Sequence, residues 1–140
     1  MNPAQTPADH VRRAYARWEE TKGASAQAFL DLFAPDIVLR TALAPFEPHP
    51  LAHDRIGIEH ARDYFESLVL NLEMLEYATE AVVAEGDRVV WIGHCRWRER
   101  RGRREVGTPK VDVWRFEHGK AVSVLEMFDT LGFARLNRLV

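Results

Sequence analysis

The stretch VDVWRFEHGKAVSVLEMFDT, from Val111 to Thr130, determines the fold that we expect for this chain. Residues alternate in polarity on both sides of His118-Gly119, which is a turn signal, so the stretch predicts two antiparallel strands joined by a tight hairpin. Successive side chains of a strand point to opposite faces of the sheet. One predicted face carries Lys110, Asp112, Trp114 and Phe116 from the first strand and Val122, Val124, Glu126 and Phe128 from the second. This face is rich in aromatic residues, so other elements must cover it.

The same alternation continues upstream of the hairpin. Strands are predicted at 76–85 and 88–99, and the two strands of the hairpin at 104–117 and 120–130, with turn signals at Gly86-Asp87 and Gly102. Strand 88–99 places Trp91, Gly93, Cys95 and Trp97 on one face. Connections this short join antiparallel neighbours, so the four strands form an antiparallel meander.

Helical spacing dominates the first seventy residues. Thr6 is predicted to cap a first helix, whose apolar stripe is Val11, Ala14, Tyr15 and Trp18, and Gly23 to end it. A second helix is expected over about 25–33, a strand over 36–41, and a third helix with Ile58, Ala61, Phe65 and Leu68 on its buried face. The prolines at 45, 48 and 50 predict a loop over 42–54. We therefore expect one α+β domain over residues 1–140, in which a curved antiparallel sheet wraps around amino-terminal helices and forms a cone with an apolar pocket.

Composition excludes several classes of partner. The chain has 140 residues, of which 46% are hydrophobic and 29% charged, as in ordinary globular proteins. A net charge of −2 argues against nucleic acid, and the single cysteine, Cys95, argues for a reducing compartment. The first ten residues lack the basic and apolar regions of a signal peptide, and no apolar run reaches membrane length. We expect a cytoplasmic protein with no membrane or nucleic-acid partner.

Two carboxylates, Asp112 and Glu126, fall on neighbouring strands of the aromatic face. Burial raises the pKa of a carboxyl group unless a donor compensates, and paired groups in different environments are suited to general acid–base catalysis. The alternative is that both carboxylates reach solvent at the pocket mouth, or pair with Lys110 or an arginine. We favour a functional role for the pair.

The order of elements and the stretch from Val111 to Thr130 resemble the nuclear transport factor 2-like superfamily. This superfamily includes ketosteroid isomerases, SnoaL-like polyketide cyclases, limonene-epoxide hydrolases and scytalone dehydratases. The resemblance covers nearly the whole chain and implies a cystatin-like, cone-shaped α+β barrel.

The resemblance also implies roles for particular residues. Asp112, in the run DVWRF, matches the oxyanion-hole aspartate of the isomerases, and Tyr15 matches their oxyanion-hole tyrosine. Glu126 falls where the cyclases and epoxide hydrolases carry a catalytic aspartate. Thr41 stands where the isomerases carry their general base, so steroid isomerisation through that base is not expected. The arginine and aspartate that complete the hydrolase triad have no counterpart in strand 88–99.

We predict a small-molecule pocket protein that acts as a cofactor-independent acid–base enzyme of the isomerase, cyclase, dehydratase or hydrolase type. Its substrate would be hydrophobic and oxygenated, with Glu126 as general base or acid and with Asp112 and Tyr15 donating to a developing oxyanion. The expected pocket wall is Trp18, Leu39, Thr41, His53, Phe65, Trp91, Trp97, Trp114 and Phe128. The alternative is a non-catalytic ligand-binding or dimerisation module of the same fold.

Three histidines, His49, His53 and His60, are spaced four and seven residues apart. They have no acidic or cysteine partner at ligand spacing, so we predict no metal site, and His53 is better suited to act as an acid or base on a loop over the pocket. Cys95 is expected to be a buried filler rather than a nucleophile.

The sheet face opposite the pocket is also apolar. It carries Val111, Val113, Leu125 and Met127, which form a patch too apolar to be left in water. This patch predicts a homodimer formed through the outer face of the sheet.

Overall fold

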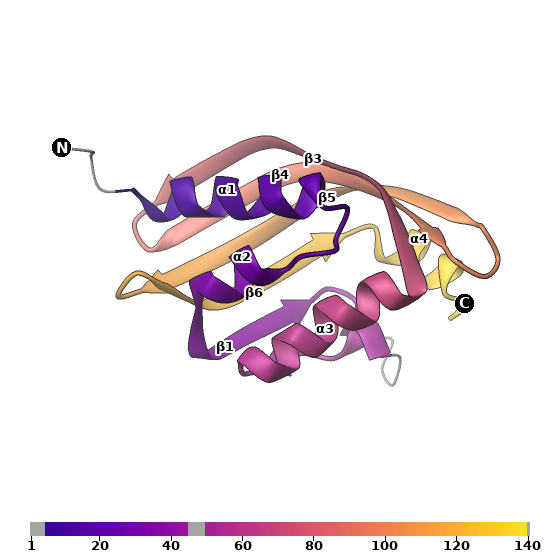
Figure 1. Cartoon of the computed structure of the whole chain (residues 1–140), viewed down its shortest axis with the longest axis horizontal. Helices are drawn as coiled ribbons and strands as arrows, with labels where there is room; N and C mark the ends of the chain where they lie inside the picture. Colours follow the sequence, from indigo (N-terminus) through magenta and orange to yellow (C-terminus); the bar gives the residue numbers. More distant parts are fainter. Residues whose placement is uncertain (1–4, 45–49, 140) are drawn as a thin grey trace.

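The structure, a computed structural model, describes residues 5–44 and 50–139. Within these residues the elements are α1 (Pro7–Glu20), α2 (Gln27–Leu32), β1 (Phe33–Thr41), the 3-10 turn η2 (Pro50–Ala52), β2 (Arg55–Ile56), α3 (Ile58–Asn71), β3 (Leu72–Glu85), β4 (Arg88–Glu99), β5 (Glu105–Glu117), β6 (Lys120–Phe128) and α4 (Thr130–Leu136). Figure 1 shows the long, bent strands β3 to β5 curving around α1, with α3 beside β1. The expected α+β fold, a curved sheet around amino-terminal helices, is confirmed. None of the described helices is long and apolar enough to span a membrane.

The sheet is mixed rather than wholly antiparallel. Its strand order is β2-β1-β6-β5-β4-β3, in which β3 to β6 form the expected antiparallel meander. Strand β1, however, pairs with β6 in parallel and places Thr41 opposite Glu126. A parallel pair needs a long crossover, which here contains the helix α3 and four strands, β2 to β5, so alternation within residues 36–41 could not identify β6 as the partner. The sheet does not close, since β2 and β3 are its two edges.

The first helix begins and packs as expected. The Thr6 hydroxyl accepts from the Asp9 backbone N–H at 3.1 Å, and the Asp9 carboxylate accepts from the Thr6 N–H at 3.0 Å, which makes a capping box. The predicted stripe, Val11, Ala14, Tyr15 and Trp18, is buried against the concave face of the sheet.

The carboxyl-terminal helix α4 was not expected. The last strand ends at Phe128, and Asp129 caps α4 by accepting from the Gly132 N–H at 2.9 Å. The buried Glu99 carboxylate accepts from Arg104 at 3.0 Å and Arg138 at 3.2 Å, which ties the residues after α4 to the β4–β5 hairpin. A seven-residue helix containing a glycine has too weak an apolar period to be recognised by its pattern.

Gly93 on β4 faces the core at a point of close approach. A Cβ atom there would overlap the backbone oxygen of Ala78 and lie 2.5 Å from the Trp91 ring.

We expect Gly93→Ala to lower the free energy of unfolding by about 1–3 kcal/mol, because neither the backbone nor a fully buried indole can move aside. Urea denaturation measures the loss. The control is Gly107→Ala on β5, where the nearest atom outside its chain neighbours lies at 3.8 Å, and equal effects of the two substitutions would contradict the assignment.

The outer face of the sheet carries an apolar patch across three strands. The cross-strand rows are Ile92–Val111–Met127 and Val90–Val113–Leu125. Five of the six side chains are half-buried in the single chain, and Met127 is 39% exposed.

A homodimer through this patch stays a prediction. We expect the protein to sediment as a dimer at micromolar concentration and Val113→Arg to sediment as a monomer, with Leu131→Arg on the exposed side of α4 as the control. A monomeric wild-type protein would contradict the prediction.

Candidate functional site

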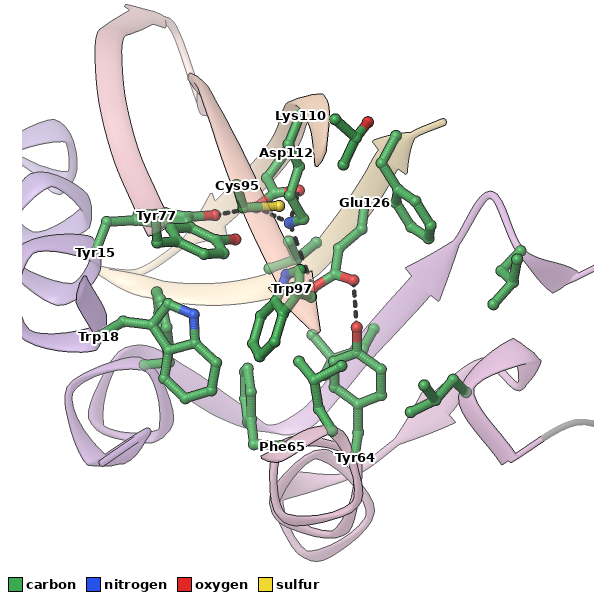
Figure 2. A pocket seen from close by; sticks show the side chains of 18 of the residues that line it. Tyr15, Trp18, Tyr64, Phe65, Tyr77, Cys95, Trp97, Lys110, Asp112 and Glu126 are labelled. Atoms are coloured by element: carbon green, nitrogen blue, oxygen red, sulfur yellow. Dashed lines mark hydrogen bonds and ion pairs between the residues drawn. The ribbon is translucent and has the colours of Figure 1, made fainter. Parts of the chain in front are cut away.

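A cavity lies between the concave face of the sheet and the helices (Figure 2). The free volume inside it is small, about 50 Å³, and reaches about 690 Å³ only when the gaps between its wall atoms and the solvent at its open side are included. Most of its wall is aromatic or aliphatic: Trp18, Phe29, Phe33, Leu39, Leu43, Leu51, Phe65, Leu68, Trp97, Trp114, Val124, Phe128 and Phe133. The remaining lining residues bring polar groups: Tyr15, Tyr64, Tyr77, Cys95, Thr108, Lys110, Asp112 and Glu126. A largely apolar cavity with a few convergent polar groups is typical of small-molecule sites.

A buried ion pair lies on β5. Lys110 and Asp112 are two residues apart on one strand, so both side chains point into the cavity. The Lys110 Nζ lies 2.6 Å from each Asp112 oxygen, and the two side chains are only 10% and 2% exposed. The Tyr15 hydroxyl donates to Asp112 and accepts from the Trp114 indole N–H at 3.0 Å. Asp112 therefore accepts hydrogen bonds from an ammonium and a phenol.

Glu126 lies opposite Asp112 in the β5–β6 register. Its Oε2 accepts a hydrogen bond from the Tyr64 hydroxyl at 2.6 Å, and its Oε1 lies 3.8 Å from the Lys110 Nζ. Burial raises the pKa of Glu126 above its usual range, and the Asp112 charge adds to this rise, although Lys110 and the Tyr64 hydrogen bond oppose it. The protonated form of Glu126 is thus favoured relative to that of an exposed glutamate.

Lys110 supplies a fixed positive charge. Burial disfavours its ammonium, but the negative charges of Asp112 and Glu126 outweigh this effect and raise the pKa of Lys110 well above its usual range. The ammonium also lies 5.9 Å from the Tyr77 ring centre and 5.8 Å from the Trp91 ring centre, within cation–π range. A lysine that stays protonated can stabilise an anion but cannot act as a nucleophile or base.

The phenols and the thiol of the cavity also stay protonated. Burial, reinforced by the neighbouring carboxylates, raises the pKa values of Tyr15 and Tyr64 well above their usual range, and burial likewise raises that of Tyr77. Burial raises the pKa of Cys95 to about 11, so its thiol is not an activated nucleophile. The tyrosines can therefore act as hydrogen-bond donors at neutral pH.

The structure brings together nine of the residues expected at the site. Tyr15, Asp112 and Glu126 meet in the cavity, and six expected wall residues line it: Trp18, Leu39, Phe65, Trp97, Trp114 and Phe128. Their places agree with the strand phases and the helix stripe. Their roles in catalysis or binding stay predictions.

Three residues expected in the wall do not line this cavity. The Thr41 hydroxyl accepts from the Leu43 N–H at 3.0 Å and so closes the turn after β1. Trp91 is completely buried behind Tyr15, with the two rings stacked 4.3 Å apart, and its indole N–H donates to Thr79 at 2.8 Å. His53 lines a separate surface depression beside α3, together with Asp54 and His60. The structure therefore places these three residues outside the lining of the cavity; for Thr41 and Trp91, alternation along a strand gives the face of a residue but not its depth.

The expected donor roles of Asp112 and Tyr15 do not fit the geometry. A carboxylate 2.6 Å from an ammonium has no proton to give, and the Tyr15 hydroxyl proton is already donated to Asp112. The cation that could receive an oxyanion is Lys110. Strand phase placed Lys110 on the inner face, so the signal was present, but the sequence alone indicated only a possible partner for a carboxylate.

Three further polar residues of the cavity, Tyr64, Tyr77 and Thr108, were not expected. Tyr64 lies on α3, three residues after Ala61 and four before Leu68, so its helical spacing is a signal that could have found it. Tyr77 lies on β3, opposite Cys95 in the β3–β4 register. Among residues 5–44 and 50–139, no three His, Cys, Asp or Glu side chains lie close enough to hold a metal ion, and His49 lies outside the described residues.

The comparison with known families identifies the fold family. The family model of the SnoaL-like domain matches residues 11–124. The chain belongs to the SnoaL-like domain family. A search of curated proteins finds no match to this SnoaL-like chain.

Solved structures similar to this SnoaL-like chain are NTF2-like and SnoaL-like proteins. An NTF2-like protein of unknown function from Burkholderia pseudomallei K96243 is 24% identical over 94% of this chain and 98% of that chain, with a TM-score of 0.78. TerC, co-crystallised with polyporic acid, is 18% identical over 95% and 99%, with a TM-score of 0.76. A protein from Jannaschia sp. CCS1, provisionally named a SnoaL-like polyketide cyclase, is 17% identical over 96% of each chain, with a TM-score of 0.69. At these identities the likeness establishes the fold of this SnoaL-like domain.

Proposed function

We propose that this SnoaL-like protein is a cofactor-independent acid–base enzyme that moves a proton on a hydrophobic, oxygenated small molecule. The observation that supports this proposal most strongly is the position of Glu126. Its carboxyl group lies in an aromatic cavity, with a pKa raised by burial and with the Lys110 ammonium 3.8 Å away. A base and a fixed cation so placed are what proton abstraction next to a carbonyl group requires.

The proposed chemistry begins with Glu126 as the base. One carboxylate oxygen takes a proton from a carbon next to a substrate carbonyl, and the C–H electron pair moves onto the carbonyl oxygen to form an enolate. The positive charge of Lys110 stabilises the oxyanion in a setting where water does not screen it. Tyr64 orients Glu126 through its 2.6 Å hydrogen bond. Return of the proton to another carbon completes an isomerisation. In a cyclisation, the enolate carbon attacks a second carbonyl carbon, and the oxygen of that carbonyl takes the proton back from Glu126.

The raised pKa of Glu126 strengthens its role as base. Proton-transfer efficiency is highest when the pKa of the catalytic group is near the working pH, and an ordinary exposed glutamate is too weak a base for this purpose. Burial moves Glu126 in the required direction. The same carboxyl group can then return its proton as an acid.

Relatives support the class of reaction. A protein from Rhodopseudomonas palustris, provisionally named an isomerase, has a TM-score of 0.76 to this chain, and the Jannaschia protein carries the provisional name of a cyclase. These provisional names are of the isomerase and cyclase types included in the proposal.

The experiment that tests the proposal is isotope exchange. The protein is incubated in heavy water with a panel of cyclic and aromatic ketones and 1,3-diketones, and deuterium incorporation beside the carbonyl is followed by NMR. We expect at least one member to exchange faster with the wild-type protein than with the variant that lacks the Glu126 carboxylate. Exchange at the same rate with both proteins, across the whole panel, would overturn the proposal.

A second candidate function is binding without chemistry. It is favoured by the fact that Tyr15, Asp112, Lys110 and Trp114 already form hydrogen bonds with one another, and by the largely apolar wall of the cavity. Panel members that bind the wild-type protein without any accelerated exchange would support this second function.

A further inference from the structure

The cavity holds an unequal number of charges. Among the described residues, the ionisable groups that carry charge in it are Lys110, Asp112 and Glu126. Lys110 and Asp112 neutralise each other in a close pair. Glu126 is therefore the surplus charge: the cavity is neutral when its carboxyl group is protonated and carries one negative charge when it is ionised.

The Lys110 ammonium has capacity for a further acceptor. Its hydrogen bonds within the described part of the chain both go to Asp112, at 2.6 Å, whereas the Glu126 oxygen at 3.8 Å is too distant for a hydrogen bond. Figure 2 shows Lys110 reaching between the two carboxylates. An ammonium has three donors, so an acceptor on the Glu126 side can be bound without disturbing Asp112.

We propose that the cavity binds the anion of a flat aromatic or alicyclic acid beside Lys110 and that Glu126 takes up one proton as the anion enters. The anion thus replaces the charge of Glu126, and the net charge of the cavity is unchanged. This inference rests on the proposed function, because it names a ligand class of the same site, one that leaves Glu126 in its protonated, acid form rather than as the base.

The physical reason is the cost of two adjacent negative charges. An anion that enters while Glu126 is ionised leaves two unpaired anions around one ammonium that Asp112 already occupies, in an apolar cavity where repulsion is weakly screened. Protonation of Glu126 removes that repulsion, and Tyr64 still satisfies its oxygen. Burial raises the pKa of Glu126, so the proton is taken up easily.

Titratable side chains face Glu126 from several elements packed around it. The titratable groups that face it are Lys110 and Asp112 from β5, Tyr64 from α3, Tyr15 from α1, Tyr77 from β3 and Cys95 from β4. The phenols and the thiol stay protonated, as their raised pKa values require. Glu126 is therefore the group through which the proton is taken up.

The test compares an acid with its neutral amide. Binding of 2-naphthoate and of 2-naphthamide is measured by calorimetry from about pH 6 to about pH 9, in buffers of different ionisation heat. At the alkaline end we expect one proton taken up per naphthoate bound, and an affinity that falls about tenfold for each pH unit. Amide binding is expected to release or take up no proton and to vary little with pH.

Two variants and one control assign the effect. Glu126→Gln should bind naphthoate more tightly than the wild-type protein at alkaline pH and without proton uptake, and Lys110→Met should lose the preference for acid over amide. Glu117→Gln removes one negative charge at an exposed position on β5 and should behave as the wild-type protein does. If Lys110→Met does not fold, Glu126→Gln alone tests the proton linkage.

The outcomes separate this inference from the proposed function. Naphthoate binding that is independent of pH in the wild-type protein, binding no tighter than that of the amide at acid pH, or no binding of either probe at millimolar concentration would overturn it. Isotope exchange dependent on Glu126 together with any of these results would overturn only the anion proposal. Proton-linked naphthoate binding without exchange in any panel member would overturn only the enzymatic one.

Discussion

Glu126→Gln is expected to slow isotope exchange by about 10²–10⁴-fold, the usual contribution of a general base. The amide keeps the shape of the side chain, and its oxygen can still accept the Tyr64 hydrogen bond of 2.6 Å. It has no basic oxygen that could take a proton from carbon. Exchange rates of the wild-type and variant proteins, measured by NMR on the same ketone, give the ratio.

Stability against pH provides an independent check on the same carboxyl group. The pKa of Glu126 is raised in the folded protein, so its stabilising contribution is complete below the pKa of the unfolded chain, about 4.3, and is lost as pH rises through the folded value. The free energy of unfolding of the wild-type protein should therefore fall with rising pH relative to that of Glu126→Gln. Glu117→Gln, at an exposed site, should follow the wild-type curve. Parallel curves for the wild-type protein and Glu126→Gln would contradict the assignment.

Lys110→Met is expected to lower the free energy of unfolding at neutral pH by about 3–5 kcal/mol, the usual cost of removing one partner of a buried ion pair. Methionine fills much the same space, so the loss comes from charge rather than volume. Asp112, whose side chain is 2% exposed, would be left with the Tyr15 hydroxyl but without a compensating cation. Urea denaturation followed by tryptophan fluorescence measures the change.

The double variant Lys110→Met, Asp112→Asn isolates the cause. It removes both charges and keeps an oxygen that can accept from Tyr15, so most of the lost stability should return. A double variant as unstable as the single one would show that the lysine acts through packing.

Much of the site could be predicted because strand phase is a local property. Alternation along residues 110–116 is sufficient to bring Lys110, Asp112 and Trp114 to one face, and the register with β6 then adds Glu126. The stripe of α1 similarly brings Tyr15 inward. These inferences require no knowledge of how the strands and helices connect in space or of how deeply a side chain is buried.

Other features of the fold and of the site could not be predicted, because they depend on how distant parts of the chain pack together. The parallel pairing of β1 with β6 joins segments more than 80 residues apart (Thr41 pairs with Glu126), so no local pattern encodes it. Trp91 is on the expected face but lies behind Tyr15, and His53 lies on the far side of α3 from the cavity. The sequence also could not show that the Tyr15 hydroxyl donates to Asp112, because this depends on how close Lys110 comes to Asp112.

The helix α4 contributes to the shape of the cavity but carries none of the residues of the proposed chemistry. Its Phe133 forms part of the cavity wall, while Lys110 and Glu126, the residues of the proposed chemistry, lie on β5 and β6. The helix is held by its own Asp129 cap and by the Glu99–Arg138 contact, neither of which touches Glu126 or Lys110. Substitutions at Phe133 can therefore reshape the volume offered to a substrate and leave the chemistry intact. In evolutionary terms, such a helix would let ligand selectivity diverge while Lys110 and Glu126 stay in place.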